Sequence, residues 1–100
     1  MDTTIERVIC EVLDQYPVKR AALFGSAARG EITAQSDIDI LVEFLPVPIG
    51  LLYFGMWDDL EKALKRKVDL LTYGSLLKQA HPVIRENALR DERQIYERAL

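Results

Sequence analysis

The chain has 100 residues with 49% hydrophobic and 29% charged content, which is typical of one globular domain spanning residues 1–100. Its net charge of −3 at pH 7 argues against direct nucleic-acid binding, because proteins that bind phosphates along a polymer usually carry a basic excess. The single cysteine excludes an intramolecular disulfide, and the lack of a signal peptide or of a run of about 20 apolar residues predicts a cytoplasmic protein without membrane contact.

The first third of the chain predicts a helix, a strand and a short helical turn. Residues 3–16 carry apolar side chains at helical spacing. Residues 18–24, VKRAALF, predict a buried strand. A helical turn over residues 26–29 then ends at Gly30, because glycine suits the left-handed position that follows a helix.

The rest of the chain predicts alternating strands and helices. Residues 37–44, DIDILVEF, place large apolar side chains on the face opposite the aspartates, as in a half-buried strand. An amphipathic helix is expected over residues 51–66 and a third strand over residues 67–73. A last helix should run over about residues 82–90, and residues 93–97 predict a short edge strand.

The helix predicted over residues 51–66 has two features that allow more than one interpretation. Its basic residues follow three acidic ones, so we favour solvated ion pairs along the helix over a nucleic-acid patch. Its first turns are richer in apolar residues than one helical stripe can bury. We favour packing of these side chains on the sheet over a docking surface; they are Leu51, Leu52, Phe54 and Met56.

The lengths of the connections predict how the strands pair. About a dozen residues join the first two strands, which is too short for a parallel crossover and favours an antiparallel pair. A full helix joins the second and third strands and makes them parallel neighbours. Both strands would then start at the same edge of the sheet, so Asp37, Asp39 and Asp69 should converge there beside Gly25 and Ser26.

The converging aspartates require a counter-ion. Side chains two residues apart on a strand lie on one face, roughly 6 to 7 Å from each other, so Asp37 and Asp39 repel unless a cation lies between them. Two Mg²⁺ ions would suit these oxygen ligands, with Asp69 completing the shell of the second ion. This arrangement is what phosphoryl or nucleotidyl transfer needs.

The turn before the aspartates has residues suited to bind the phosphates of a nucleotide. Gly25 lets the backbone approach a phosphate, and Ser26 can donate both its hydroxyl and its N–H. Arg29 would add positive charge toward the phosphates, or would only cap the turn.

These motifs together resemble a known family. GSAARG at residues 25–30, SDID at residues 36–39 and KRKVDLLT around Asp69 resemble the minimal nucleotidyltransferases (MNT) of the DNA polymerase β superfamily, in particular the antitoxins paired with HEPN-domain toxins. The resemblance covers residues 18–73 and implies an α/β nucleotidyltransferase fold, a small mixed β-sheet with helices packed on it. It also implies Mg²⁺-dependent transfer of AMP from ATP to a hydroxyl of the partner toxin, a tyrosine hydroxyl in characterised relatives, with release of pyrophosphate.

Each motif alone has an ordinary structural interpretation. A Gly-Ser segment is often a plain turn, and Asp-x-Asp at a strand start is often a solvated strand end. Their combination favours a metal site with Asp37, Asp39 and Asp69 as catalytic ligands and Gly25, Ser26 and Arg29 on the phosphates.

Three functions remain compatible with the sequence. The first is the adenylyltransferase antitoxin, the second a non-catalytic antitoxin that inhibits its partner by occlusion, and the third a small-molecule nucleotidyltransferase. We favour the first, because an idle cluster of like charges would only cost stability. The acceptor wall of the cleft should come from a partner protein or from a second copy in a homodimer, and the residues do not distinguish ATP from another nucleoside triphosphate.

Overall fold

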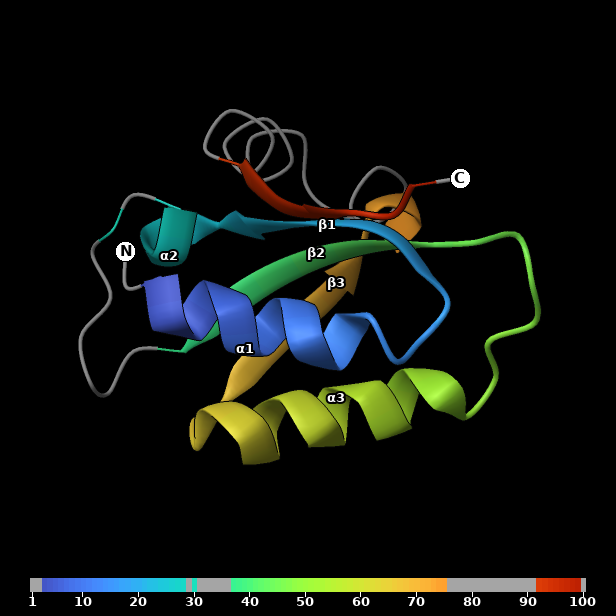
Figure 1. Cartoon of the computed structure of the whole chain (residues 1–100), viewed down its shortest axis with the longest axis horizontal. Helices are drawn as coiled ribbons and strands as arrows, with labels where there is room; N and C mark the ends of the chain where they lie inside the picture. The colour runs from blue at the N-terminus through green and yellow to red at the C-terminus, as the bar shows by residue number, and fades with distance from the viewer. Residues whose placement is uncertain (1–2, 29, 31–36, 76–91, 100) are drawn as a thin grey trace.

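Four short strands form the sheet at the centre of the computed structural model, which describes residues 3–28, 30, 37–75 and 92–99 (Figure 1). The strands are β1 (Val18–Phe24), β2 (Ile38–Phe44), β3 (Val68–Thr72) and β4 (Arg93–Glu97). Their order in the sheet is β3-β2-β1-β4. All four predicted strands are confirmed within one residue or so at each end.

The described helices also agree with the sequence pattern. They are α1 (Thr3–Leu13), α2 (Gly25–Ala28) and α3 (Leu52–Leu64). The short helix α2 begins one residue earlier than predicted. The first helix ends three residues before the predicted end, and α3 is shorter than predicted by one residue at its start and two at its end. The helix expected over residues 82–90 lies outside the described residues. None of the described helices is both long and apolar enough to cross a bilayer.

The strand pairing confirms the predicted topology. The β1 strand runs antiparallel to both of its neighbours, β2 and β4. The β2 and β3 strands are parallel and are joined through α3, as expected for a crossover connection. The sheet is therefore mixed, and the starts of β2 and β3 lie at one edge, next to the end of β1.

Strand alternation divides the buried side chains between the two faces of the sheet. The helices α1 and α3 cover one face of the sheet (Figure 1). Their side chains pack against every second residue of the strands to form the main core. Ile38, Ile40 and Val42 of β2 lie on this face and are fully buried. The opposite face has a smaller apolar cluster of Leu41 and Tyr73, against which Phe24 packs.

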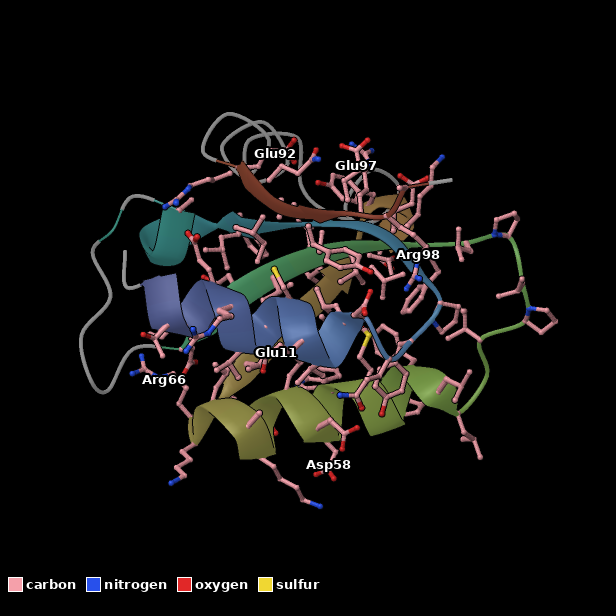
Figure 2. All side chains as sticks on the ribbon, in the orientation of Figure 1. Glu11, Asp58, Arg66, Glu92, Glu97 and Arg98 are labelled. Carbon is pink, nitrogen blue, oxygen red and sulfur yellow. The ribbon has the colours of Figure 1, made fainter. Side chains whose placement is uncertain are left out.

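The outward face of the second half of α3 is polar, as predicted. Asp58 projects away from the sheet (Figure 2), and its carboxylate forms an ion pair of 2.8 Å with the ammonium of Lys62, four residues later. This is the solvated ion pairing that we expected from basic residues that follow acidic ones along the helix.

The apolar start of α3 differs from our expectation. Of the four side chains that we expected to pack on the sheet, only Met56 is buried. Leu51 is 83% exposed and Phe54 63% exposed, and Leu52 is also exposed. A helix on the surface of a sheet buries only the stripe of side chains that faces the core, and the other three residues lie outside that stripe.

This difference between neighbouring apolar residues gives a direct test of the core. We expect Met56→Ala to lower the free energy of unfolding by about 2–4 kcal/mol, because it leaves a cavity beneath α3. Leu51→Ala, the matched exposed control, should change it by less than about 0.5 kcal/mol. Urea unfolding followed by circular dichroism would measure both, and equal losses would contradict the described packing.

Candidate active site

The register of the two parallel strands brings two of the predicted site residues together. Asp39 of β2 and Asp69 of β3 are direct partners across the strand pair. Both side chains are half-buried. Asp37 lies two residues before Asp39, on the same face by strand alternation, and is exposed. The starts of β2 and β3 thus place the three acidic residues at one edge of the sheet, as the topology predicts.

The end of β1 completes this edge through Gly25. Phe24 pairs with Asp39, and Gly25 follows with a positive φ of 63°. A Cβ atom on Gly25 would lie 2.7 Å from the Oδ2 atom of Asp39, closer than any real Cβ contact. The residue must therefore be glycine here both for its backbone angle and for the space that the carboxylate occupies.

The carboxylate of Asp39 is held in an unfavourable electrostatic environment. Burial, a hydrogen bond with the Asp69 side chain, and repulsion from Asp69 and then Asp37 raise the pKa of Asp39 to about 6. The hydrogen bond raises the pKa because the protonated Asp39 donates it. The folded chain therefore favours a proton, or another positive charge, between these two carboxylates.

The donor chemistry of this edge suits Mg²⁺. Among residues 3–28, 30, 37–75 and 92–99, no three acidic, histidine or cysteine side chains are grouped into a cage that could hold a metal ion. Mg²⁺ rarely uses such a cage, since it is usually bound by one or two carboxylates together with substrate phosphates and water. The half-buried pair of Asp39 and Asp69 provides two hard oxygen ligands of this kind. The three-carboxylate site with two ions stays a prediction.

The phosphate-binding residues are described only in part. Gly25 and the backbone of Ser26 lie in the first turn of α2, directly after β1. Arg29 lies outside the described residues. The roles of Gly25, Ser26 and Arg29 on the phosphates stay predictions, although the contact between Gly25 and Asp39 places this turn beside the acidic edge.

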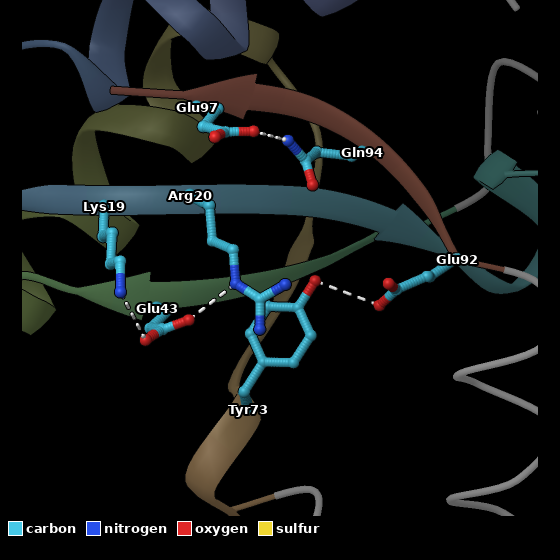
Figure 3. Close-up of polar contacts among 7 residues, drawn as sticks. All are labelled: Lys19, Arg20, Glu43, Tyr73, Glu92, Gln94 and Glu97. Carbon is cyan, nitrogen blue, oxygen red and sulfur yellow. Dashed lines mark hydrogen bonds and ion pairs between the residues drawn. The ribbon is translucent and has the colours of Figure 1, made fainter. Parts of the chain in front are cut away.

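A second group of polar contacts, which the sequence analysis did not anticipate, lies on the same face of the sheet (Figure 3). The Nε atom of Arg20 donates to the Glu43 carboxylate at 2.6 Å, and its guanidinium lies 4.2 Å from the ring centre of Tyr73. The hydroxyl of Tyr73 donates to Glu92 at 3.0 Å. Lys19 also pairs with Glu43, at 3.7 Å.

Lys19 and Arg20, the two basic residues of β1, are therefore paired with Glu43. Arg20 precedes Phe24 by four residues, which is roughly 13 Å along a strand. Its partner Glu43 is likewise four residues from Asp39 at the other end of β2. A regular antiparallel pairing of β1 with β2 predicts the Arg20–Glu43 contact. The stacking of Arg20 on Tyr73 has no signal in the sequence.

A hollow of about 350 Å³ lies near these contacts and away from the aspartates. The described residues that line it are Lys19, Arg20, Gln94, Glu97, Arg98 and Ala99. They belong to the first part of β1, to β4 and to the residues that follow β4, so this hollow is separate from the edge that carries Asp39.

Comparisons with known proteins agree with the fold. A family model described as "Nucleotidyltransferase domain" matches residues 5–95. A relative from Methanocaldococcus jannaschii, MJ0435, which is provisionally named a protein adenylyltransferase, is 41% identical over 87 residues, or 87% of this chain and 89% of the relative.

Two solved structures have a similar fold. One belongs to a toxin–antitoxin complex with AMP-PNP and matches with a TM-score of 0.71 and 25% identity, over 93% of this chain and 73% of that chain. The other belongs to a complex of a tri-AMPylated Shewanella oneidensis HEPN toxin with an MNT antitoxin. It matches with a TM-score of 0.67 and 23% identity, over 98% of this chain and 74% of that chain, and this likeness shows the fold alone.

The contact between Gly25 and Asp39 can be tested with a matched glycine. Gly25→Ala should lower the free energy of unfolding by about 1–3 kcal/mol more than Gly50→Ala does. Gly50 also has a positive φ, of 52°, but a Cβ atom there would meet nothing within 4 Å. The difference between the two variants, measured by urea unfolding, therefore reports the clash with Asp39. Equal losses would mean that only the backbone angle matters.

The repulsion at Asp39 gives a pH-dependent prediction. Because its folded-state pKa of about 6 lies above the ordinary value of 3.8, the folded chain loses stability as the pH rises through about 6. Asp39→Asn removes this loss. Without divalent cations, it should raise the free energy of unfolding by about 1–2 kcal/mol near neutral pH, since water screens part of the repulsion, and by little below about pH 4.

Unfolding curves of the wild type and of Asp39→Asn at about pH 4 and about pH 7.5, with a chelator present, would measure this effect. Asp58→Asn is the control, because it removes an exposed carboxylate that is paired with Lys62 and should lower stability slightly near neutral pH. A gain for Asp39→Asn that is the same at both pH values would contradict the electrostatic explanation.

Proposed function

This chain belongs to the nucleotidyltransferase family, and we propose that it is an antitoxin that transfers AMP from ATP to a hydroxyl of a partner HEPN-type toxin. The resemblance to minimal nucleotidyltransferases that the sequence predicts is confirmed by the family match and by the relatives. The observation that carries the proposal is the pairing of Asp39 with Asp69 at the edge where Gly25 begins α2.

The proposed reaction forms one bond and breaks one at the α-phosphorus of the nucleotide. The acceptor oxygen attacks this phosphorus, the bond to the bridging oxygen breaks, and pyrophosphate leaves. The hydroxyl proton passes to the Asp69 carboxylate, which lies on the edge strand β3. Asp39 lies between Asp69 on one side and Gly25 on the other, so it would face the α-phosphate while the α2 turn faces the remaining phosphates.

Asp37, Asp39 and Asp69 are the residues that would hold Mg²⁺ in this site. When bound, the metal would supply the positive charge that the triphosphate and the three carboxylates require. The raised pKa of Asp39 supports this assignment, because burial and the neighbouring carboxylates of Asp69 and Asp37 disfavour its negative charge, which a cation would offset.

The proposal of a protein acceptor draws on the related proteins. MJ0435 is provisionally named a protein adenylyltransferase, and the similar chain with AMP-PNP belongs to a toxin–antitoxin complex. A tri-AMPylated HEPN toxin accompanies the MNT antitoxin of Shewanella oneidensis. A tyrosine hydroxyl of the partner is the acceptor that we propose for this chain.

Mass spectrometry can test the proposed function directly. The protein encoded next to this chain would be incubated with the chain, ATP and Mg²⁺, and its intact mass measured. We expect a gain of one or more AMP groups, which Asp39→Asn should reduce at least about a thousandfold because the site loses a ligand charge. Peptide mapping would then identify the modified hydroxyl.

The control variant for this experiment is Asp58→Asn. Asp58 is an exposed carboxylate on the outward face of α3, so its loss should leave transfer unchanged (Figure 2). Transfer that persists in Asp39→Asn would refute the assignment of the acidic edge. A tight complex without any mass gain would favour inhibition by occlusion, and AMP transfer to a small molecule alone would favour the third function.

A further inference from the structure

Three side chains of α3 form a row along the outer edge of the sheet. Tyr53, Trp57 and Glu61 are spaced four residues apart, so they lie on one side of the helix. This side faces β3, an edge strand of the sheet, which among the described strands pairs only with β2. The outward N–H and C=O groups of an edge strand need other partners.

Each member of the row bonds to the backbone of β3. The indole Nε1 of Trp57 donates to the carbonyl oxygen of Val68 at 2.7 Å. The backbone N–H of Val68 donates to Oε2 of Glu61 at 2.9 Å. The hydroxyl of Tyr53 donates to the carbonyl oxygen of Leu70 at 2.8 Å. Both polar backbone groups of Val68 are thus held by side chains of α3.

Asp69 lies between the two residues that receive these bonds, Val68 and Leu70. On the inner side of β3, the N–H of Ile38 donates to the carbonyl oxygen of Lys67 at 3.1 Å. The backbone that leads into Asp69 is therefore fixed from β2 on one side and from α3 on the other. Asp69 needs such support, because it lies directly opposite Asp39 and the two carboxylates repel.

We propose that Trp57 and Glu61 are positioning residues of the transfer reaction, which hold the backbone at Val68 so that Asp69 stays beside Asp39. This inference rests on the proposed function, since Asp69 is taken there as the group that receives the acceptor proton. In this arrangement both residues act through the backbone of Val68. Their bonds also shield the strand edge from other chains, but a role in shielding alone would leave the rate of transfer by the monomeric folded protein unchanged.

The role of Glu61 can be tested with two substitutions of similar size. Glu61→Met removes the oxygen that accepts from Val68, whereas Glu61→Gln keeps an amide oxygen at the same place. We expect Glu61→Met to lower kcat for AMP transfer at least about tenfold, because small misplacements of a catalytic group are costly, with KM for ATP changed less than about twofold. Glu61→Gln should keep most of the wild-type kcat.

Trp57→Phe removes the indole donor while it keeps an aromatic ring, and we expect the same selective fall in kcat. Tyr96→Phe is the matched control, because the Tyr96 hydroxyl donates to Asp14 at 3.0 Å, away from β3. All rates would be divided by the fraction of folded protein, determined from urea unfolding of each variant. Control rates should equal those of the wild type.

The outcomes separate this inference from the function on which it rests. A wild-type chain that transfers nothing would refute the proposed function and the positioning role together. If the wild type transfers AMP but Glu61→Met and Trp57→Phe do so equally well per folded molecule, only the positioning role is refuted. A fall in kcat that Glu61→Gln does not share, with KM for ATP preserved, would support it.

Discussion

The direct pairing of Asp39 with Asp69 is the constraint on which the rest of the site depends. Two carboxylates on neighbouring strands repel, and the burial of Asp39 makes the repulsion stronger. Keeping negative charge at this edge of the sheet therefore lowers the stability of the folded chain. Such an arrangement is useful to a protein whose substrate arrives with cations and leaves with them, because the repulsion becomes attraction on binding.

The crossover helix α3 contributes to this pairing in two ways. It makes β3 parallel to β2, so that the starts of both strands meet at the same edge. Its side chains also bond to the side of β3 that faces away from β2. One element thus determines both the direction of the strand that carries Asp69 and the position of its backbone.

Much of this arrangement could be predicted from the sequence. Connection lengths alone give the antiparallel and parallel pairs, and these pairs bring Asp37, Asp39 and Asp69 to one edge. The predicted reason for Gly25 was incomplete. A sequence pattern cannot show that the carboxylate of Asp39, on the neighbouring strand, would lie too close to a Cβ atom at this position.

Other features could not be predicted because they depend on register and on helix rotation. The β1–β2 register shifts between Val18 and Arg20, and Lys19, which lies in this irregular part, also pairs with Glu43. Likewise, periodicity shows that α3 has an apolar stripe, but only packing decides that Met56 belongs to the stripe and Phe54 does not.

The order of the strands in the sheet also bears on how the chain folds as it leaves the ribosome. The β1 strand lies inside the sheet, yet one of its two neighbours, β4, comes from the last part of the chain. Asp37, Asp39 and Asp69 are all synthesised before β4, so a nascent chain can pair β1, β2 and β3 while the other side of β1 is still open. During this interval the unpaired side of β1 can form hydrogen bonds with strands of other nascent chains. Pairing with Arg93–Glu97 then covers this side of β1.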